Sequence, residues 1–255
     1  MDPSFYLDPG IPRRIEGWHS PALGQPMPIV GYGTWGHPLL LFPTAAADFL
    51  ENERFLLVKA IEHQIRDGRV RVFSINSINS QAWMDRGLPV AEQARRQMLY
   101  ARYVEEEAAP YIRAACRTPD IRIATAGASF GAFHAANTLL RRPDLFDAVV
   151  AMSGFYDLGP DYLRGFSDDN SYYNNPLSYL PGLDGDYLHL LRTACKIHLL
   201  TGQGAYEAPD ASRRLAALLT EKGIPHFLDV WGHDVDHDWP WWRKMLPYAI
   251  DVMGW

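Results

Sequence analysis

Residues 121–146 read IRIATAGASFGAFHAANTLLRRPDLF, and this stretch decides the fold. An apolar, strand-like run leads into Gly-Ala-Ser-Phe-Gly at 127–131, and a helix-like run follows. A serine at a sharp strand-to-helix turn has strained backbone dihedrals, and the chain there leaves no room for side chains two positions before and after it. Gly127 and Gly131 meet that steric demand. The pattern predicts that Ser129 is a nucleophile exposed above the edge of a sheet.

The same glycines would also ease the packing of a helix on a sheet, with the serine incidental, and a GxSxG match alone does not separate these interpretations. The strand before it and the helix after it favour catalysis. The helix directs its N-terminal amides toward the place where negative charge would develop. The backbone N–H of Phe130 is therefore the first candidate donor of an oxyanion hole.

Strand-like and helix-like runs alternate along the rest of the chain. The strand candidates are 37–43, 70–76, 148–154, 196–202 and 226–232, and the helix candidates include 51–68, 91–115 and 212–223. Residues 13–33 are punctuated by proline and glycine and predict two antiparallel edge strands. The alternation predicts an α/β fold with a mostly parallel central sheet and helices on both faces. Residues 158–186 interrupt it as a loop-rich insertion, predicted to lie near the active site of a single domain, 1–255.

A serine hydroxyl needs a base within hydrogen-bond reach, and that base is most often an imidazole. The last strand candidate runs into His233-Asp234-Val235-Asp236-His237-Asp238. We favour His237, because the tryptophans after it can pack the loop and fix the ring; His233, directly at the strand end, is the alternative. A metal site made by the histidines and aspartates of this run is disfavoured, because no partner cluster of ligands stands out elsewhere. We therefore expect neither a metal nor another cofactor.

The acid that orients the histidine is expected after the penultimate strand, between the serine and the histidine in chain order. That loop holds Glu207 and Asp210. Glu207 comes sooner after the strand, whereas Asp210 stands at the start of a helix and could simply cap it. Glu207 is the preferred acid, with Asp210 as the alternative.

A second oxyanion donor is expected in the loop after the strand at 37–43, where Thr44 or Ala45 would supply it. The small residues of this loop could equally form the first turn of a helix. Several aromatic residues stand in loops expected to face the site, and a few of them could line an apolar pocket for the substrate. They are Trp35, Tyr172, Tyr173, Tyr206, Trp239, Trp241 and Trp242.

The composition fits this interpretation and limits the partners. The chain has 255 residues, of which 47% are hydrophobic, so one domain can bury a full core. A net charge of -6 without a basic stripe argues against nucleic acid as a partner. The two cysteines, Cys116 and Cys195, indicate neither a zinc site nor a disulfide scaffold. No signal peptide or membrane span is recognised, which points to the cytoplasm, while a homo-oligomer stays possible.

The chain resembles the putative esterase family of α/β-hydrolases, which includes esterase D, enterobactin esterases, feruloyl esterases and mycolyltransferases. The resemblance is carried by HSPALGQPMPIVGYG at 19–33, the strand at 37–43, GASFGAFHAANTLLRRPDLFDAVVAMSGFYD at 127–157 and HDWPWWRKMLPY at 237–248. It implies the α/β-hydrolase fold and a triad of Ser129, an acid in the loop 201–210, and His237. The chain departs from the family in that acid loop and in PTAAADF at 43–49, where many relatives carry more glycine.

These features predict a serine carboxylesterase that hydrolyses small-molecule acyl esters through an acyl-enzyme on Ser129. An acyltransferase would use the same residues and admit an alcohol in place of water. A non-catalytic protein that binds a ligand through the same cleft is a third possibility, although it predicts a broken triad. The natural substrate does not follow from the sequence.

Overall fold

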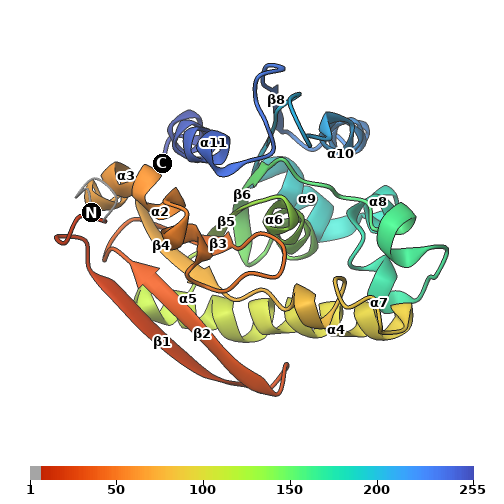
Figure 1. The fold of residues 1–255 in the computed structure, drawn as a ribbon, viewed down its shortest axis with the longest axis horizontal. Helices are drawn as coiled ribbons and strands as arrows, with labels where there is room; N and C mark the ends of the chain where they lie inside the picture. The colour runs from red at the N-terminus through yellow and green to blue at the C-terminus, as the bar shows by residue number, and fades with distance from the viewer. Residues whose placement is uncertain (1–6) are drawn as a thin grey trace.

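A computed structural model describes residues 7–255. Eight strands form one sheet in the order β1-β2-β4-β3-β5-β6-β7-β8 (Figure 1). Their bounds are β1 Arg13–Ser20, β2 Gln25–Tyr32, β3 His37–Phe42, β4 Val70–Ile75, β5 Ile123–Ala128, β6 Phe146–Met152, β7 Lys196–Thr201 and β8 Phe227–Val230. β2 pairs antiparallel with β1 and β4, and every other neighbouring pair is parallel. The predicted mostly parallel sheet with antiparallel N-terminal strands is confirmed.

Helices cover both faces of this sheet. One face packs against α4 (Val90–Tyr103), the π-helical turn η3 (Val104–Ala108), α5 (Ala109–Ala115), α6 (Phe130–Arg141), α9 (Gly185–Thr193) and α10 (Pro209–Glu221). The other face packs against α2 (Leu57–Ala60), α3 (Glu62–Arg66) and α11 (Trp239–Met253). Figure 1 shows α4 and α11 on opposite sides of the strands. No helix within residues 7–255 is long and apolar enough to cross a membrane.

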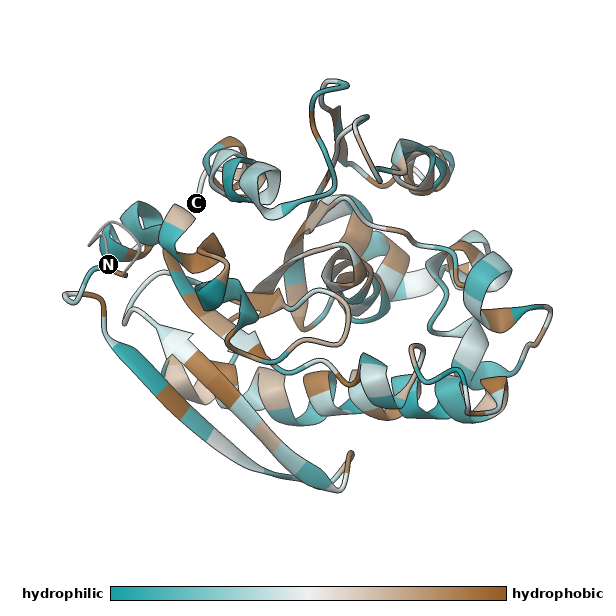
Figure 2. Ribbon diagram, in the orientation of Figure 1, coloured by the Kyte–Doolittle hydropathy of each residue, from teal (hydrophilic) through white to brown (hydrophobic). Residues whose placement is uncertain are grey.

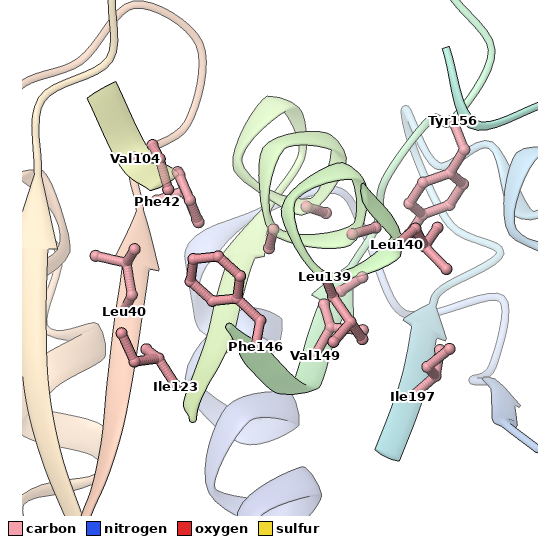
Figure 3. Close-up of a cluster of buried hydrophobic side chains, with 14 of the residues drawn as sticks. Leu40, Phe42, Val104, Ile123, Leu139, Leu140, Phe146, Val149, Tyr156 and Ile197 are labelled. Atoms are coloured by element: carbon pink, nitrogen blue, oxygen red, sulfur yellow. The ribbon is translucent and has the colours of Figure 1, made fainter. Parts of the chain in front are cut away.

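The strand residues alternate between the two cores. On β3, Leu40 and Phe42 join the cluster under α6, whereas Leu39 and Leu41 join the cluster under α11. Figure 3 shows Leu40 and Phe42 on the α6 side, together with Ile123 and Phe146 of the next two strands. Both faces of the central strands are therefore apolar, as a parallel sheet between two helix layers requires. The hydrophobic colouring of the central strands and of α6 in Figure 2 reflects this burial.

The helix predicted over 51–68 is not continuous. It is divided into α1 (Glu51–Arg54), α2 and α3, and the break after α1 lies at Leu56, which has a left-handed φ of 64°. Tertiary contacts hold that break: Phe55 stacks on Trp239 with ring centroids 4.7 Å apart, and Arg243 donates to the carbonyl of Phe55. Contacts with α11 thus override the helical periodicity of the sequence.

The loop-rich insertion consists of short helical turns rather than open loop. They are η4 (Gly159–Leu163), α7 (Asp169–Tyr172), α8 (Pro176–Tyr179) and η5 (Leu180–Gly182). Outside the insertion, a further short turn, η2, spans Asn79–Gln81. Asn175 ties this insertion to the segment that follows β6, because its side-chain oxygen accepts from the N–H of Leu158 and its NH₂ donates to Asp157. Hydrogen bonds between Asn137 and both Asn174 and Tyr179 also hold the insertion beside α6.

Candidate active site

The candidate residues follow parallel strands at the carboxyl edge of the sheet. Ser129 comes directly after β5, Glu207 follows β7 and His237 follows β8. The backbone N–H of Ser129 donates to the carbonyl of Met152 at the end of β6, at 2.9 Å. The residue after Met152, Ser153, donates its backbone N–H to the carbonyl of Leu200 on β7 at 2.7 Å. The topology therefore brings these chain segments to one edge of the sheet.

Ser129 occupies the strained turn that the sequence predicts. Its φ of 56° and ψ of -121° are unfavourable for a residue with a Cβ and cost about 1–3 kcal/mol. A Cβ on Gly127 would lie 2.4 Å from the carbonyl carbon of Gly131, and a Cβ on Gly131 would lie 2.6 Å from the carbonyl oxygen of Phe42. Both glycines are therefore required by the close approach of β5, α6 and β3.

Glu207 is the buried carboxylate of the site. Its side chain is 1% exposed, and its two oxygens accept from the hydroxyls of Ser153 at 2.5 Å and Thr201 at 3.0 Å. Ser153 in turn accepts a hydrogen bond from the indole N–H of Trp242 at 3.0 Å. Burial alone would raise the pKa of Glu207, but polar contacts with His237, Ser153 and Thr201 outweigh it and lower that pKa. Glu207 is therefore held ionised at neutral pH.

His237 faces this carboxylate from the loop after β8. Its Nδ1 lies 3.9 Å from Oε2 of Glu207, an ion-pair separation that is longer than a hydrogen bond. Its backbone N–H donates to the carbonyl of Ala205 at 3.0 Å, and its ring stands edge-on to Trp242 at 5.1 Å. Within residues 7–255 the Ser129 hydroxyl has no hydrogen bond to His237; such catalytic contacts commonly tighten only when substrate binds.

The alternative acid and base are both exposed at the surface. Asp210 is 87% exposed and pairs with Arg213 at 2.8 Å on the first turn of α10, and His233 is exposed. Asp236 accepts from the backbone N–H of Ala205, and Asp238 caps α11. Among residues 7–255, no three histidine, cysteine or carboxylate side chains converge as metal ligands would. Within the run 233–238, Asp236 therefore fixes the loop beside His237, and Asp238 caps the N-terminus of α11.

Two backbone amides are available for an oxyanion hole. The N–H groups of Phe130, the first residue of α6, and of Ala45 donate to no acceptor among residues 7–255. The amide of Thr44 is occupied, because it donates to the carboxylate of Glu51 at 2.6 Å while the Thr44 hydroxyl donates to the other oxygen. The Thr44 alternative is therefore not supported, and Ala45 is the one of the two predicted donors whose amide is free.

A polar segment after β4 fixes that loop, and the sequence analysis did not single it out. Asn76 accepts from the N–H of Phe49 at 2.8 Å, and the N–H of Ser77 donates to the carbonyl of Ala47 at 3.1 Å. The side chains of Ser77 and Asn79 both donate to the carbonyl of Ala45. The available sequence signal was the run NSINS at 76–80, small polar residues around one isoleucine, directly after a strand.

The aromatic residues predicted to face the site divide into separate groups. Trp242 contacts His237 and donates to Ser153, and Trp239 packs on Trp242. Trp35 precedes β3 and therefore lies at the opposite edge of the sheet, so its assignment to the pocket is wrong. Tyr172 and Tyr173 line a cavity of about 280 Å³ with Arg141, about 16 Å along α6 from its first residue, so they too lie away from Ser129.

The remaining two aromatic candidates are Tyr206 and Trp241. Tyr206, next to Glu207, is 94% exposed, and the ring of Trp241 lies under the ammonium group of Lys244 at 4.1 Å.

Other rings surround the residue after the nucleophile. The ring of Phe130 stands edge-on to Phe155 at 4.9 Å and to Tyr162 of the insertion at 5.6 Å. The insertion therefore reaches the nucleophile turn through Tyr162.

Comparison with known proteins identifies the family of this chain. A family model with the description "Putative esterase" matches residues 57–251, which include Ser129, Glu207 and His237. This chain belongs to that family. Its members are serine enzymes that hydrolyse carboxylic esters, and the chain is such an enzyme. A search of curated protein sequences gives no match.

Solved structures share the α/β-hydrolase fold of this esterase. A ferulic acid esterase superposes with a TM-score of 0.73 at 19% identity, over 95% of this chain and 97% of the other. FphF, a fluorophosphonate-binding serine hydrolase of Staphylococcus aureus, gives 0.72 at 16% identity over 95% and 98%. S-formylglutathione hydrolase from Staphylococcus aureus gives 0.69 at 16% identity over 95% and 96%. The predicted fold class is confirmed.

Proposed function

We propose that this esterase uses Ser129 as nucleophile, His237 as base and Glu207 as acid, with the amides of Phe130 and Ala45 as its oxyanion hole. The arrangement of Glu207 carries the proposal. A carboxylate that is 1% exposed, hydrogen-bonded by two hydroxyls and directed at a histidine suits the task of fixing one imidazole tautomer. The strained serine lies on the same edge of the sheet.

The geometry supports acyl transfer in two steps. His237 removes the proton from the Ser129 hydroxyl while the oxygen attacks the ester carbonyl, and the resulting oxyanion accepts from the two free amides. Collapse of this intermediate breaks the ester C–O bond, and His237 returns its proton to the departing alcohol. Water, deprotonated by the same histidine, then attacks the acyl-enzyme. The bond between the acyl carbon and Oγ of Ser129 breaks, His237 returns the proton to Oγ, and the carboxylic acid leaves. The 3.9 Å gap between His237 and Glu207 would close as the imidazolium forms.

Hydrolysis of short p-nitrophenyl esters tests the assignment. Ser129→Ala, His237→Ala and Glu207→Gln should each lose about 10³-fold or more in kcat/KM, whereas the matched controls His233→Ala and Asp210→Ala should stay within about twofold of the wild type. Full activity in Ser129→Ala would contradict the proposal. Loss in Asp210→Ala with retention in Glu207→Gln would move the acid to the alternative position.

The same preparation separates the other candidate functions. Covalent labelling by a fluorophosphonate, abolished in Ser129→Ala, would distinguish an enzyme from a non-catalytic binding protein, and activity that survives a chelator would argue against a metal-dependent hydrolase. Addition of a short alcohol would reveal an acyltransferase, because the transferred ester would accumulate in place of the acid. We keep residence in the cytoplasm as a prediction, to be tested by cell fractionation.

A further inference from the structure

Ala45 has a backbone conformation that an alanine rarely adopts, with φ at 40°. Both peptide groups that flank it are fixed. The carbonyl of Thr44 accepts from the N–H of Ala47 at 3.1 Å, and the carbonyl of Ala45 accepts from Ser77 at 3.0 Å and from Asn79 at 2.5 Å. In a planar trans peptide the N–H is directed opposite to the carbonyl of the same peptide group, so the bond to Thr44 fixes the direction of the Ala45 N–H. The bonds from Ser77 and Asn79 hold the following peptide group, and with it the position of Ala45.

Asn79 is itself held by the nucleophile helix. Its side-chain oxygen lies 3.0 Å from Nε2 of His134, and both side chains are buried. Because the NH₂ of Asn79 donates to Ala45, its oxygen must be the acceptor, and His134 must carry a proton on Nε2. Burial lowers the pKa of His134 to about 3, so the ring is neutral at working pH and serves as a fixed donor.

The His134 ring is locked by aromatic neighbours from both sides of the candidate oxyanion hole. It stacks on Phe130, the residue that supplies the other free amide, with centroids 5.4 Å apart, and on Phe42, at the end of β3, at 6.0 Å. Tyr100 meets the ring edge-on at 5.1 Å. The ring can therefore neither turn nor withdraw without disturbing the turn that bears Phe130.

We propose that His134 and Asn79 are positioning residues that hold the Ala45 amide in the oxyanion hole, an inference that rests on the proposed function. One helix, α6, then sets both donors: Phe130 at its first turn directly, and Ala45 through His134 and Asn79. Donors must lie about 2.7–3.1 Å from the developing oxyanion, and loss of one costs about 10²–10³-fold in kcat. A donor that is loosened rather than removed should cost about 10–100-fold.

Four variants test by kinetics whether His134 and Asn79 position Ala45. Asn79→Ala and His134→Phe should each lower kcat about 10–100-fold and leave KM within about twofold, because the oxyanion forms only after substrate has bound. His134→Gln keeps an N–H donor for Asn79 and should recover most of the loss seen in His134→Phe. The matched control is Asn137→Ala on the same helix, where a buried amide bonds Asn174 and Tyr179; it should keep the kcat of the wild type.

A trifluoromethyl ketone supplies a readout that a merely structural role would not move, because its tetrahedral adduct places an oxyanion in the same hole. Its inhibition constant should rise in Asn79→Ala and His134→Phe by the factor by which kcat/KM falls, and should not change in Asn137→Ala. If Asn79→Ala does not fold, the His134→Phe and His134→Gln pair decides by the same criterion.

Folded variants of Asn79 and His134 that keep both kcat and inhibitor affinity would overturn the positioning role while the esterase proposal stood. A wild-type protein that neither hydrolyses esters nor reacts with a fluorophosphonate would instead overturn the proposed function itself. The two failures are thus distinguished by the wild type alone.

Discussion

Replacement of Ser153 by alanine would remove the hydroxyl that connects the candidate triad acid to the core. This hydroxyl donates to Glu207 at 2.5 Å and accepts from Trp242 at 3.0 Å. Alanine keeps the Cβ and therefore the backbone strain of Ser153, whose φ is 51°. The substitution leaves Glu207 with Thr201 as its remaining hydroxyl donor and leaves the buried indole N–H of Trp242 without its acceptor.

The magnitude follows from these two contacts. A hydrogen bond to a charged group contributes about 1.5–3 kcal/mol, and a buried donor left unpaired costs about 1–3 kcal/mol. Partial relaxation makes these costs less than additive, so we expect the free energy of unfolding of Ser153→Ala to fall by about 2–4 kcal/mol at pH 7. The loosened acid should also lower kcat/KM roughly tenfold, which corresponds to about 1.4 kcal/mol.

The loss should depend on pH in a defined direction. The pKa of Glu207 lies below its ordinary value of 4.5, so its contribution to stability is full above that value and is lost as the pH falls through the lowered pKa. Removal of a donor raises the pKa of Glu207 toward the ordinary value. The difference between wild type and Ser153→Ala should therefore be greatest at neutral pH and should shrink as the pH falls below about 4.5.

Urea unfolding at several pH values measures the stability, and p-nitrophenyl ester hydrolysis measures the activity. Ser153→Gly is the matched variant, because it removes the same hydroxyl while glycine tolerates a positive φ. It should be about 1 kcal/mol more stable than Ser153→Ala and should lose as much kcat/KM. Wild-type stability and full activity in Ser153→Ala would refute the role assigned to this hydroxyl.

Three further substitutions test the geometry around the site. Gly131→Ala would place a Cβ 2.6 Å from the carbonyl oxygen of Phe42 and should lower the free energy of unfolding by about 1–3 kcal/mol in urea, whereas Gly182→Ala, with 3.5 Å to its nearest neighbour, should change it little. Thr201→Val removes the second hydroxyl on Glu207 and should lower the apparent melting temperature and, to a smaller extent than Ser153→Ala, kcat/KM. Asp238→Ala removes the N-cap of α11 and should cost about 1 kcal/mol by chemical denaturation; an unchanged midpoint would show that the cap contributes nothing.

The sequence indicated the parts of this molecule whose cause is local. The turn at Ser129 follows from glycines two positions before and after it, and the strands follow from short apolar runs. The helix predicted over 51–68 failed because its break at Leu56 depends on contacts with α11, nearly 190 residues away, which no local pattern records.

The supporting residues of the site could not be found in the same way. Ser153 and Glu207 are 54 positions apart, and Asn79 and His134 are 55 positions apart. Ser153, Asn79 and His134 are common polar residues whose contacts exist only because the sheet order places β4 beside β3 and β6 beside β7. Sequence analysis named the residues expected to react; the contacts that orient them depend on topology.

This difference bears on the loop 43–49, PTAAADF, which contains no glycine. A left-handed alanine costs about 1–2 kcal/mol relative to glycine, so the φ of 40° at Ala45 needs compensation. Ser77 and Asn79 both donate to its carbonyl, and two such bonds contribute about 1–3 kcal/mol in total. The free-energy cost of the positive φ at Ala45 and the stabilisation from these two hydrogen bonds are therefore of similar size. A loop without glycine can keep its amide free in this esterase because the end of the neighbouring strand, rather than the loop's own sequence, holds it in place.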